Sequence, residues 1–189
     1  TNITLCMNPR IGSATSFYRC FFTGNFPNRI FYFFLYCNGI FLYLACNINS
    51  EVFSVPEVRK ALTFAIDRDT IAAEFYRGFA YSASLPAAPQ SPYYSDVLAA
   101  KYAYDGGALL PQVIADASVI GKPVTLLVNR DDSLRLRVAR SIGETLKAAG
   151  LDVQMQELDT AAYTKALSRN EFDIYLGQTK LSPNMDLTP

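Results

Sequence analysis

The sequence of 189 residues contains no histidine and no tryptophan, and its 17 basic and 17 acidic residues give a formal net charge of zero. Without histidine, the chain lacks the commonest general base and metal-binding side chain. It also has no G-x-S-x-G motif and no glycine-rich phosphate-binding loop. These absences argue against an α/β enzyme, so we expect no catalytic residues, no metal ligands and no cofactor. Since no basic stripe stands out, nucleic acid is not an expected partner.

The four cysteines, Cys6, Cys20, Cys37 and Cys46, form no C-x-x-C pair, so the spacing gives no support to a zinc site. Two interpretations of these cysteines remain open. In an exported protein they can form disulfides, with three possible pairings. Alternatively, they are buried free thiols that pack as small hydrophobic side chains.

A run of apolar residues long enough to cross a membrane is also missing. Residues 30–46 are almost entirely apolar and aromatic, but a spanning helix needs ~20 such residues. Asn38-Gly39 interrupts the run at its centre and is typical of a two-residue hairpin turn. We therefore predict two paired strands at 30–37 and 40–47. The alternative is a membrane-associated or protein-interaction domain built on residues 30–46.

The last third of the chain alternates between strand and helix patterns. Residues 124–129, 151–158 and 172–177 read as short buried strands, and the two segments between them have helical spacing of apolar residues. This order predicts parallel strands joined by right-handed crossovers. With the hairpin added, the fold class is α/β: a mixed sheet with a parallel βαβαβ portion and helices packed on it.

Residues 54–69 predict two consecutive helices. The first has apolar residues on one stripe and a possible capping box formed by Ser54 and Glu57. Asp67 or Asp69 is expected to cap the second helix. The stripe consists of Val58, Ala61, Leu62, Ala65 and Ile66.

The order of residues in this stretch is more specific than its periodicity. Val58-Arg59-Lys60-Ala61-Leu62 followed by Ala65-Ile66-Asp67-Arg68 resembles the signature of the family 5 extracellular solute-binding proteins, the peptide-binding components of ABC importers. Segments 43–47, 52–54, 146–153 and 172–177 also match that family in kind and order, so the resemblance covers residues 43–187.

The resemblance implies that residues 1–189 are a single lobe of a type II periplasmic binding protein and a fragment of a longer, two-lobed chain. The prolines and tyrosines after Gly78 predict a long internal loop at residues 79–104. The resemblance further implies that the protein captures peptides or similar small solutes in a cleft between two lobes and delivers them to ABC transporter permease subunits. The full-length protein would be periplasmic or extracellular and anchored to the membrane. Related proteins take peptides, nickel or sugars, so the class of solute stays open.

Ligands of open α/β sheets lie beyond the carboxyl ends of the strands. Polar side chains near the predicted strand ends can serve the main chain and the termini of an extended peptide. The candidates are Asn47, Asn129, Arg130, Asp131, Gln178, Lys180, Asn184 and Asp186. Peptide binders of the resembled family often place an aspartate after the last strand against the ligand's amino terminus, and Asp186 is the first aspartate there. Two alternatives remain: Asp131 and Asp132 only cap the following helix, and Asn184 and Asp186 only form a turn.

Overall fold

The computed structural model describes residues 29–37, 39–85, 87, 89 and 94–180. The expectations for Asn184 and Asp186, and for three of the cysteine side chains, lie outside the part that is described. The strands are β1 (Arg29–Cys37), β2 (Ile40–Asn47), β3 (Tyr81–Ser82), β4 (Pro123–Asn129), β5 (Asp152–Leu158) and β6 (Ile174–Lys180). The helices are α2 (Pro56–Ala65), α3 (Arg68–Tyr76), α4 (Asp96–Ala100), α5 (Leu109–Asp116), α6 (Ser133–Ala148) and α7 (Thr160–Arg169).

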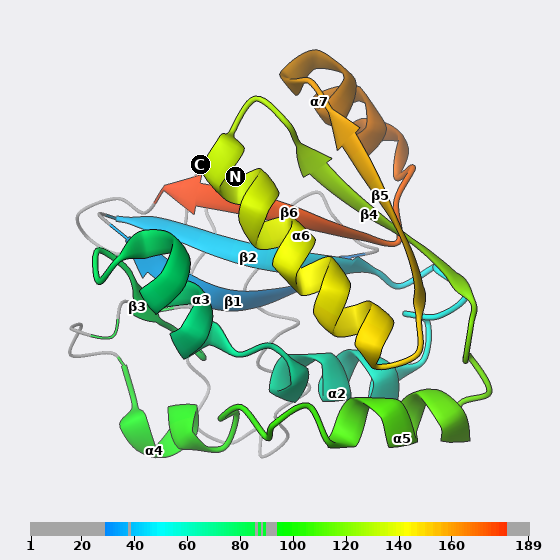
Figure 1. Ribbon diagram of the computed structural model, residues 1–189, viewed down its shortest axis with the longest axis horizontal. Coiled ribbons are helices and arrows are strands. Elements are labelled where there is room, and N and C mark those ends of the chain that lie inside the picture. The colour runs from blue at the N-terminus through cyan, green and yellow to red at the C-terminus, as the bar shows by residue number, and fades with distance from the viewer. Residues whose placement is uncertain (1–28, 38, 86, 88, 90–93, 181–189) are drawn as a thin grey trace, which may run out of the picture.

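All six strands form one mixed sheet in the order β3-β1-β2-β6-β4-β5 (Figure 1). β4 pairs in parallel with both β5 and β6, as the strand-helix alternation predicts. β2 pairs antiparallel with β6, and this pairing joins the hairpin to the parallel portion. The predicted α/β class is confirmed, and the carboxyl ends of β4, β5 and β6 lie at one end of the sheet.

The apolar segment at 30–46 forms the predicted hairpin. β1 and β2 are antiparallel, and Cys37 pairs with Ile40 at the turn. Gly39 has φ +77°, a conformation that glycine adopts without the strain a side chain would cause. No helix among the described residues is long and apolar enough to cross a bilayer.

The helix boundaries follow local signals, with one exception. The side chain of Asp67 accepts from the N–H of Thr70 at 2.9 Å, so Asp67 caps α3 as expected. The prediction of a capping box at Ser54 and Glu57 is wrong. Val55 occupies the N-cap position of α2, and no side chain caps that helix. The Ser54 hydroxyl instead donates to the carbonyl of Glu51 at 3.2 Å.

The segment at 79–104, expected to be one long loop, contains a two-residue strand and a short helix. β3 pairs with β1 at the end of the sheet order, and Ser95 caps α4 by accepting from the N–H of Leu98. After this segment, Gly106 and Gly107 both have positive φ and separate α4 from α5. Pro111 lies in the first turn of α5, where a missing N–H costs no helical hydrogen bond.

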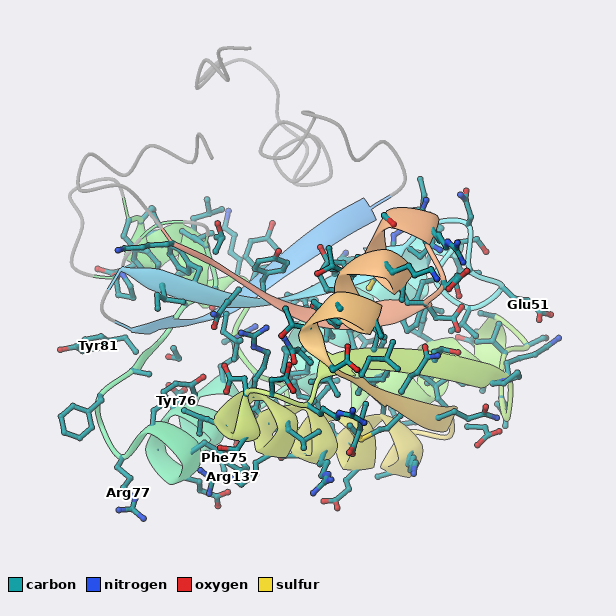
Figure 2. All side chains as sticks on the ribbon, turned by 90° about the horizontal axis from the view of Figure 1, so that it is seen from above. Glu51, Phe75, Tyr76, Arg77, Tyr81 and Arg137 are labelled. Atoms are coloured by element: carbon teal, nitrogen blue, oxygen red, sulfur yellow. The ribbon has the colours of Figure 1, made fainter. Side chains whose placement is uncertain are left out.

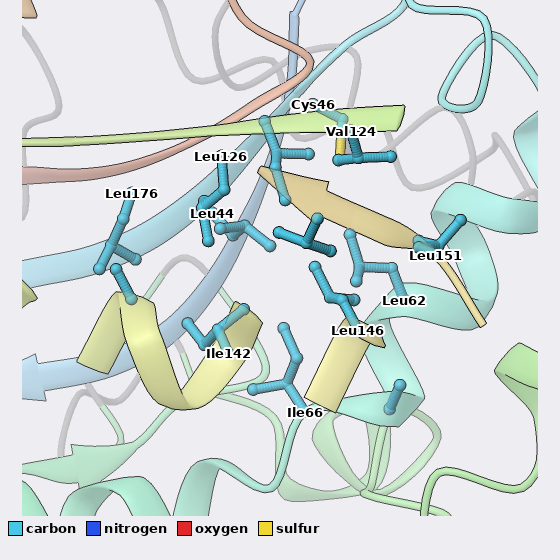
Figure 3. Close-up of a cluster of buried hydrophobic side chains, with 14 of the residues drawn as sticks. Leu44, Cys46, Leu62, Ile66, Val124, Leu126, Ile142, Leu146, Leu151 and Leu176 are labelled. Carbon is cyan, nitrogen blue, oxygen red and sulfur yellow. The ribbon is translucent and has the colours of Figure 1, made fainter. Parts of the chain in front are cut away.

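The larger hydrophobic core, here called the α6-face core, packs α2, α3, α5 and α6 against one face of the sheet (Figure 3). Its largest fully buried side chains are Leu44, Phe53, Leu62, Leu110, Ile114, Leu126, Ile142, Leu146 and Ile174. Cys46 belongs to this core as a free thiol with no exposed surface. Burial raises the pKa of the Cys46 thiol, so this cysteine fits the prediction of a buried thiol that packs as a hydrophobe.

The opposite face of the sheet is covered by α7 and carries a second, aromatic cluster. Tyr163 of α7 donates its hydroxyl to the carbonyl of Leu176 at 2.9 Å, which attaches the helix to β6. A Cβ atom on Gly177 would lie 2.7 Å from Cζ of Tyr43, so only glycine leaves room for that ring. Gly177 thus lets the ring of Tyr43, its partner on β2, pack directly against the backbone of β6.

Candidate ligand-binding rim

The carboxyl ends of the three parallel strands bring residues 129–132, 158–160 and 177–180 together, and we call this region the carboxyl-end rim. β4 lies between β5 and β6, so each strand end has a neighbour. The N–H of Arg130 donates to the carbonyl of Leu158 at 2.8 Å, which continues the pairing of β4 and β5 past the last strand residue. The rim therefore holds five of the eight predicted site residues: Asn129, Arg130, Asp131, Gln178 and Lys180.

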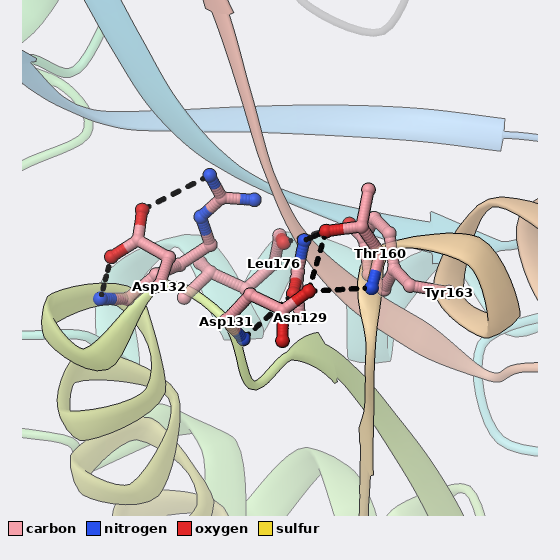
Figure 4. Close-up of polar contacts among 7 residues, drawn as sticks. Asn129, Asp131, Asp132, Thr160, Tyr163 and Leu176 are labelled. Carbon is pink, nitrogen blue, oxygen red and sulfur yellow. Dashed lines mark hydrogen bonds and ion pairs between the residues drawn. The ribbon is translucent and has the colours of Figure 1, made fainter.

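Asn129 and Asp131 are joined to the start of α7 by a compact hydrogen-bond network (Figure 4). Oδ2 of Asp131 accepts from the N–H of Thr160 at 2.8 Å and from its hydroxyl at 2.7 Å. Nδ2 of Asn129 donates to the same hydroxyl at 3.0 Å, and its Oδ1 accepts from the N–H of Asp131 at 2.9 Å. Asp131 thus acts as an additional cap on α7, whereas Asp132 is the residue that caps α6.

The charge of Asp131 is favoured by the same contacts. The hydrogen bonds from the side chain and the backbone of Thr160 lower the pKa of the Asp131 carboxyl below its usual value. Because the pKa is lower in the folded chain than in the unfolded chain, the network contributes stability at neutral pH. That contribution is lost as the pH falls through the lowered pKa. The Asp131 carboxylate therefore already has hydrogen-bond partners within the rim, both on Thr160.

Arg130 follows β4 directly and carries an exposed charged side chain. Nη2 of Arg130 lies 3.5 Å from Oδ2 of Asp159, and 57% of its side chain is exposed. An exposed ion pair of this kind contributes little stability. The guanidinium of Arg130 can therefore exchange Asp159 for a carboxylate or carbonyl oxygen of a ligand at small cost.

Gln178 and Lys180 lie at the rim, but within β6 and not beyond its end, where the predicted strand at 172–177 would place them. β6 continues to Lys180 because β2 provides antiparallel partners, with Leu42 opposite Gln178 and Ile40 opposite Lys180. The expectation that the strand ends at Gly177 is therefore wrong by three residues. Both side chains are exposed, and neither forms a hydrogen bond with the described residues.

Asn47 is not at the rim. Because β2 is antiparallel to β6, its carboxyl end lies beside the amino end of β6, at the other end of the sheet. Nδ2 of Asn47 donates to the carbonyl of Phe172 at 3.0 Å, and its N–H donates to the carbonyl of Asp173 at 2.8 Å. With 7% of its surface exposed, Asn47 holds the start of β6, and the prediction that it lies with the other site residues is wrong.

The sequence analysis did not single out Thr160, a rim residue, or Arg135, which lies next to the rim in α6. Thr160 accepts and donates at the centre of the network that joins β4 to α7. Arg135 is buried in the first turn of α6 and forms an ion pair with Asp132. The sequence does indicate that Arg135 is buried, because it lies three residues before Val138 on the apolar stripe of the helix. Among the described residues, no group of three acidic or cysteine side chains is placed to hold a metal ion.

Comparison with known proteins places the chain in a family. The family model described as bacterial extracellular solute-binding proteins, family 5 Middle, matches residues 30–187. The oligopeptide-binding protein AppA of Bacillus subtilis is 26% identical over 147 residues, which are 70% of this chain and 27% of that protein. The chain therefore spans about a quarter of the length of this curated relative.

Solved structures share the fold. The structure of Bacillus subtilis AppA in complex with a nonapeptide superposes with a TM-score of 0.64 at 24% identity and covers 84% of this chain and 34% of that one. NikA from Brucella suis, in complex with Fe(III)-EDTA, gives a TM-score of 0.65 at 22% identity, covering 82% and 33%. DppA from Helicobacter pylori, an ABC transporter-associated periplasmic binding protein in complex with the peptide STSA, gives 0.65 at 22% identity, covering 86% and 31%. At these identities the likeness shows the fold, that of a periplasmic binding protein.

Proposed function

This chain belongs to the bacterial extracellular solute-binding proteins of family 5, and we propose that it is one lobe of a longer protein that encloses a solute between two lobes. The family match over residues 30–187 is the observation that carries this proposal. Solute binding in such a cleft requires no reaction. Closure of two lobes replaces water around the ligand with matched polar groups.

The carboxyl-end rim is the part of this lobe that faces the ligand in our proposal. Gln178 and Lys180 support it, because their exposed side chains are uncommitted among the described residues. Arg130 adds an exposed guanidinium at the end of β4, on the side of β5. Asn129 and Asp131 hold the shape of the rim through Thr160. Asn184 and Asp186 follow β6 in the sequence and complete the proposed set of ligand-binding residues.

Peptides are the proposed solute. The relative from Bacillus subtilis is an oligopeptide-binding protein, and its structure contains a nonapeptide. An extended peptide presents N–H and C=O groups along its whole length, and amide and charged side chains at strand ends can pair with them. We further propose that the longer protein works outside the cell, is anchored to the membrane and delivers the peptide to ABC transporter permease subunits.

The substitution Gln178→Ala in the longer protein is expected to weaken peptide binding about fivefold to tenfold, because it removes one hydrogen bond to the ligand. Gln154→Ala is the matched control, since Gln154 is an exposed glutamine on β5 at the level of Thr125, away from the rim. Calorimetric titration with a mixed peptide library measures both variants. Equal affinities of the Gln178 and Gln154 variants would place the ligand elsewhere.

A further inference from the structure

Two neighbouring aromatic side chains, those of Phe79 and Tyr81, are exposed to solvent where the chain leaves α3. Phe79 has 75% of its surface exposed and Tyr81 has 54%, and the Tyr81 side chain points away from the body of the molecule (Figure 2). Apolar residues that are exposed singly are ordinary on a protein surface, whereas a group of them marks a candidate contact surface. We call these two side chains the aromatic corner.

The backbone holds the aromatic corner in a fixed position. The N–H of Phe79 donates to the carbonyl of Tyr76 at 2.8 Å, which closes the turn at the end of α3. Ala80, between the two aromatic residues, is buried in the α6-face core, and Tyr81 begins β3, which pairs with β1. A partner therefore meets two side chains whose backbone is already ordered, so the contact costs less conformational entropy.

The aromatic corner lies at the same end of the sheet as the carboxyl-end rim. Tyr81 pairs with Tyr36, one residue before β1 ends at Cys37. Cys37 pairs with Ile40, and Ile40 pairs with Lys180 at the carboxyl end of β6. Figure 1 shows β3 and the end of β6 on the same side of the molecule. In the order of the sheet, β1 and β2 lie between β3 and β6, which gives a separation of ~14 Å at ~4.8 Å per strand spacing.

This separation favours a protein surface, and not the solute, as the partner of the aromatic corner. A peptide of three residues spans at most ~10 Å, so one that lies over the ends of β4, β5 and β6 does not reach β3. The second lobe of a closing binder covers both the solute and the protein surface around it. This chain covers 34% of the AppA structure, so a protein of that length has enough further chain to form such a lobe. Arg77 is also exposed beside Phe79, which favours a facing surface that is apolar and carries a carboxylate.

We propose that the aromatic corner contacts the second lobe when the two lobes close on a solute. This inference rests on the proposed function and adds a determinant of affinity that the solute does not touch. The contact forms only in the closed state, so it shifts the equilibrium between open and closed protein toward closure. Removing the contact therefore weakens the binding of every solute by the same factor, whatever side chains the solute carries.

The test is Phe79→Ser in the longer protein, with binding measured by calorimetry for Ala-Ala-Ala, Ala-Phe-Ala and a mixed peptide library. We expect every probe that binds the unchanged protein to bind the variant about tenfold more weakly, because the variant loses the burial of one aromatic ring on closure. Phe79 is exposed, so the substitution leaves the folded lobe intact. The matched control is Ile120→Ser, since Ile120 is 64% exposed in the turn before β4, at the opposite end of the sheet. That substitution should leave all affinities unchanged.

The two tripeptides separate a lobe contact from a pocket for the solute. A loss confined to Ala-Phe-Ala shows that Phe79 binds an apolar side chain of the solute, and it overturns the lobe contact. Unchanged affinity of Phe79→Ser for every probe overturns the lobe contact as well. Both results leave the proposed function intact, since the protein still binds peptide. Failure of the unchanged protein to bind any of the probes overturns the proposed function, and the inference falls with it.

Discussion

Expressed alone, the 189-residue chain is expected to bind peptides about a thousandfold more weakly than the longer protein we propose it belongs to. In a two-lobed binder each lobe supplies only part of the contacts, and the other side of the ligand stays in water when one lobe is missing. The remaining contacts must still offset the full entropic cost of association. Losing ~4 kcal/mol of contact free energy corresponds to about three powers of ten in the dissociation constant.

Calorimetry with one mixed peptide library on both proteins measures this difference. A cooperative denaturation curve for the chain alone is the control that it is folded, since an unfolded chain would also fail to bind. Submicromolar binding by the folded chain would contradict the two-lobed site. The rim would then be a complete receptor by itself.

Ile142→Ala is expected to lower the free energy of unfolding by about 2 to 5 kcal/mol. Ile142 has no exposed surface and lies on the buried face of α6, in the core drawn in Figure 3. Removing three of its side-chain carbons leaves a cavity between α6 and the sheet. Neighbours such as Leu126 and Leu176 are themselves fully buried, so they have little freedom to fill it.

The matched control is Ile120→Ala, because Ile120 has 64% of its surface exposed in the turn before β4. That substitution should change the free energy of unfolding by no more than about 0.5 kcal/mol. Urea denaturation of both variants gives the comparison. Similar losses for the two isoleucines would show that α6 does not pack on the sheet as described.

Local signals in the sequence were sufficient for most of the fold. Asn38-Gly39 located the hairpin turn, and the predicted strands at 124–129 and 151–158 differ from β4 and β5 by one residue at the start. Asp159 caps the start of α7 and Asn170, with positive φ, ends it, positions for which both residue types have a local preference. Each of these features depends on a few neighbouring residues, which explains why the pattern of a single sequence can reveal it.

The features that sequence reasoning missed depend on residues far apart in the chain. The extension of β6 to Lys180 depends on pairing with Ile40, 140 positions earlier. The sequence groups Asn47 with the other candidates because it ends a predicted strand, but the direction of that strand relative to β6 decides which end of the sheet Asn47 occupies. Likewise, Nε of Arg135 is buried without a hydrogen-bond partner among the described residues, which follows from packing on the sheet that charge and periodicity alone do not specify.

The central claim, that the ligand lies at the carboxyl-end rim, is tested most directly by backbone hydrogen exchange of the longer protein with and without bound peptide. Protection reports, segment by segment, which amides become less accessible. We predict slower exchange on binding at residues 129–133 and 178–180, and unchanged exchange at residues 48–53, beyond Asn47 at the opposite end of the sheet. Protection at 48–53 with none at the rim, in a protein saturated with peptide, would contradict the account.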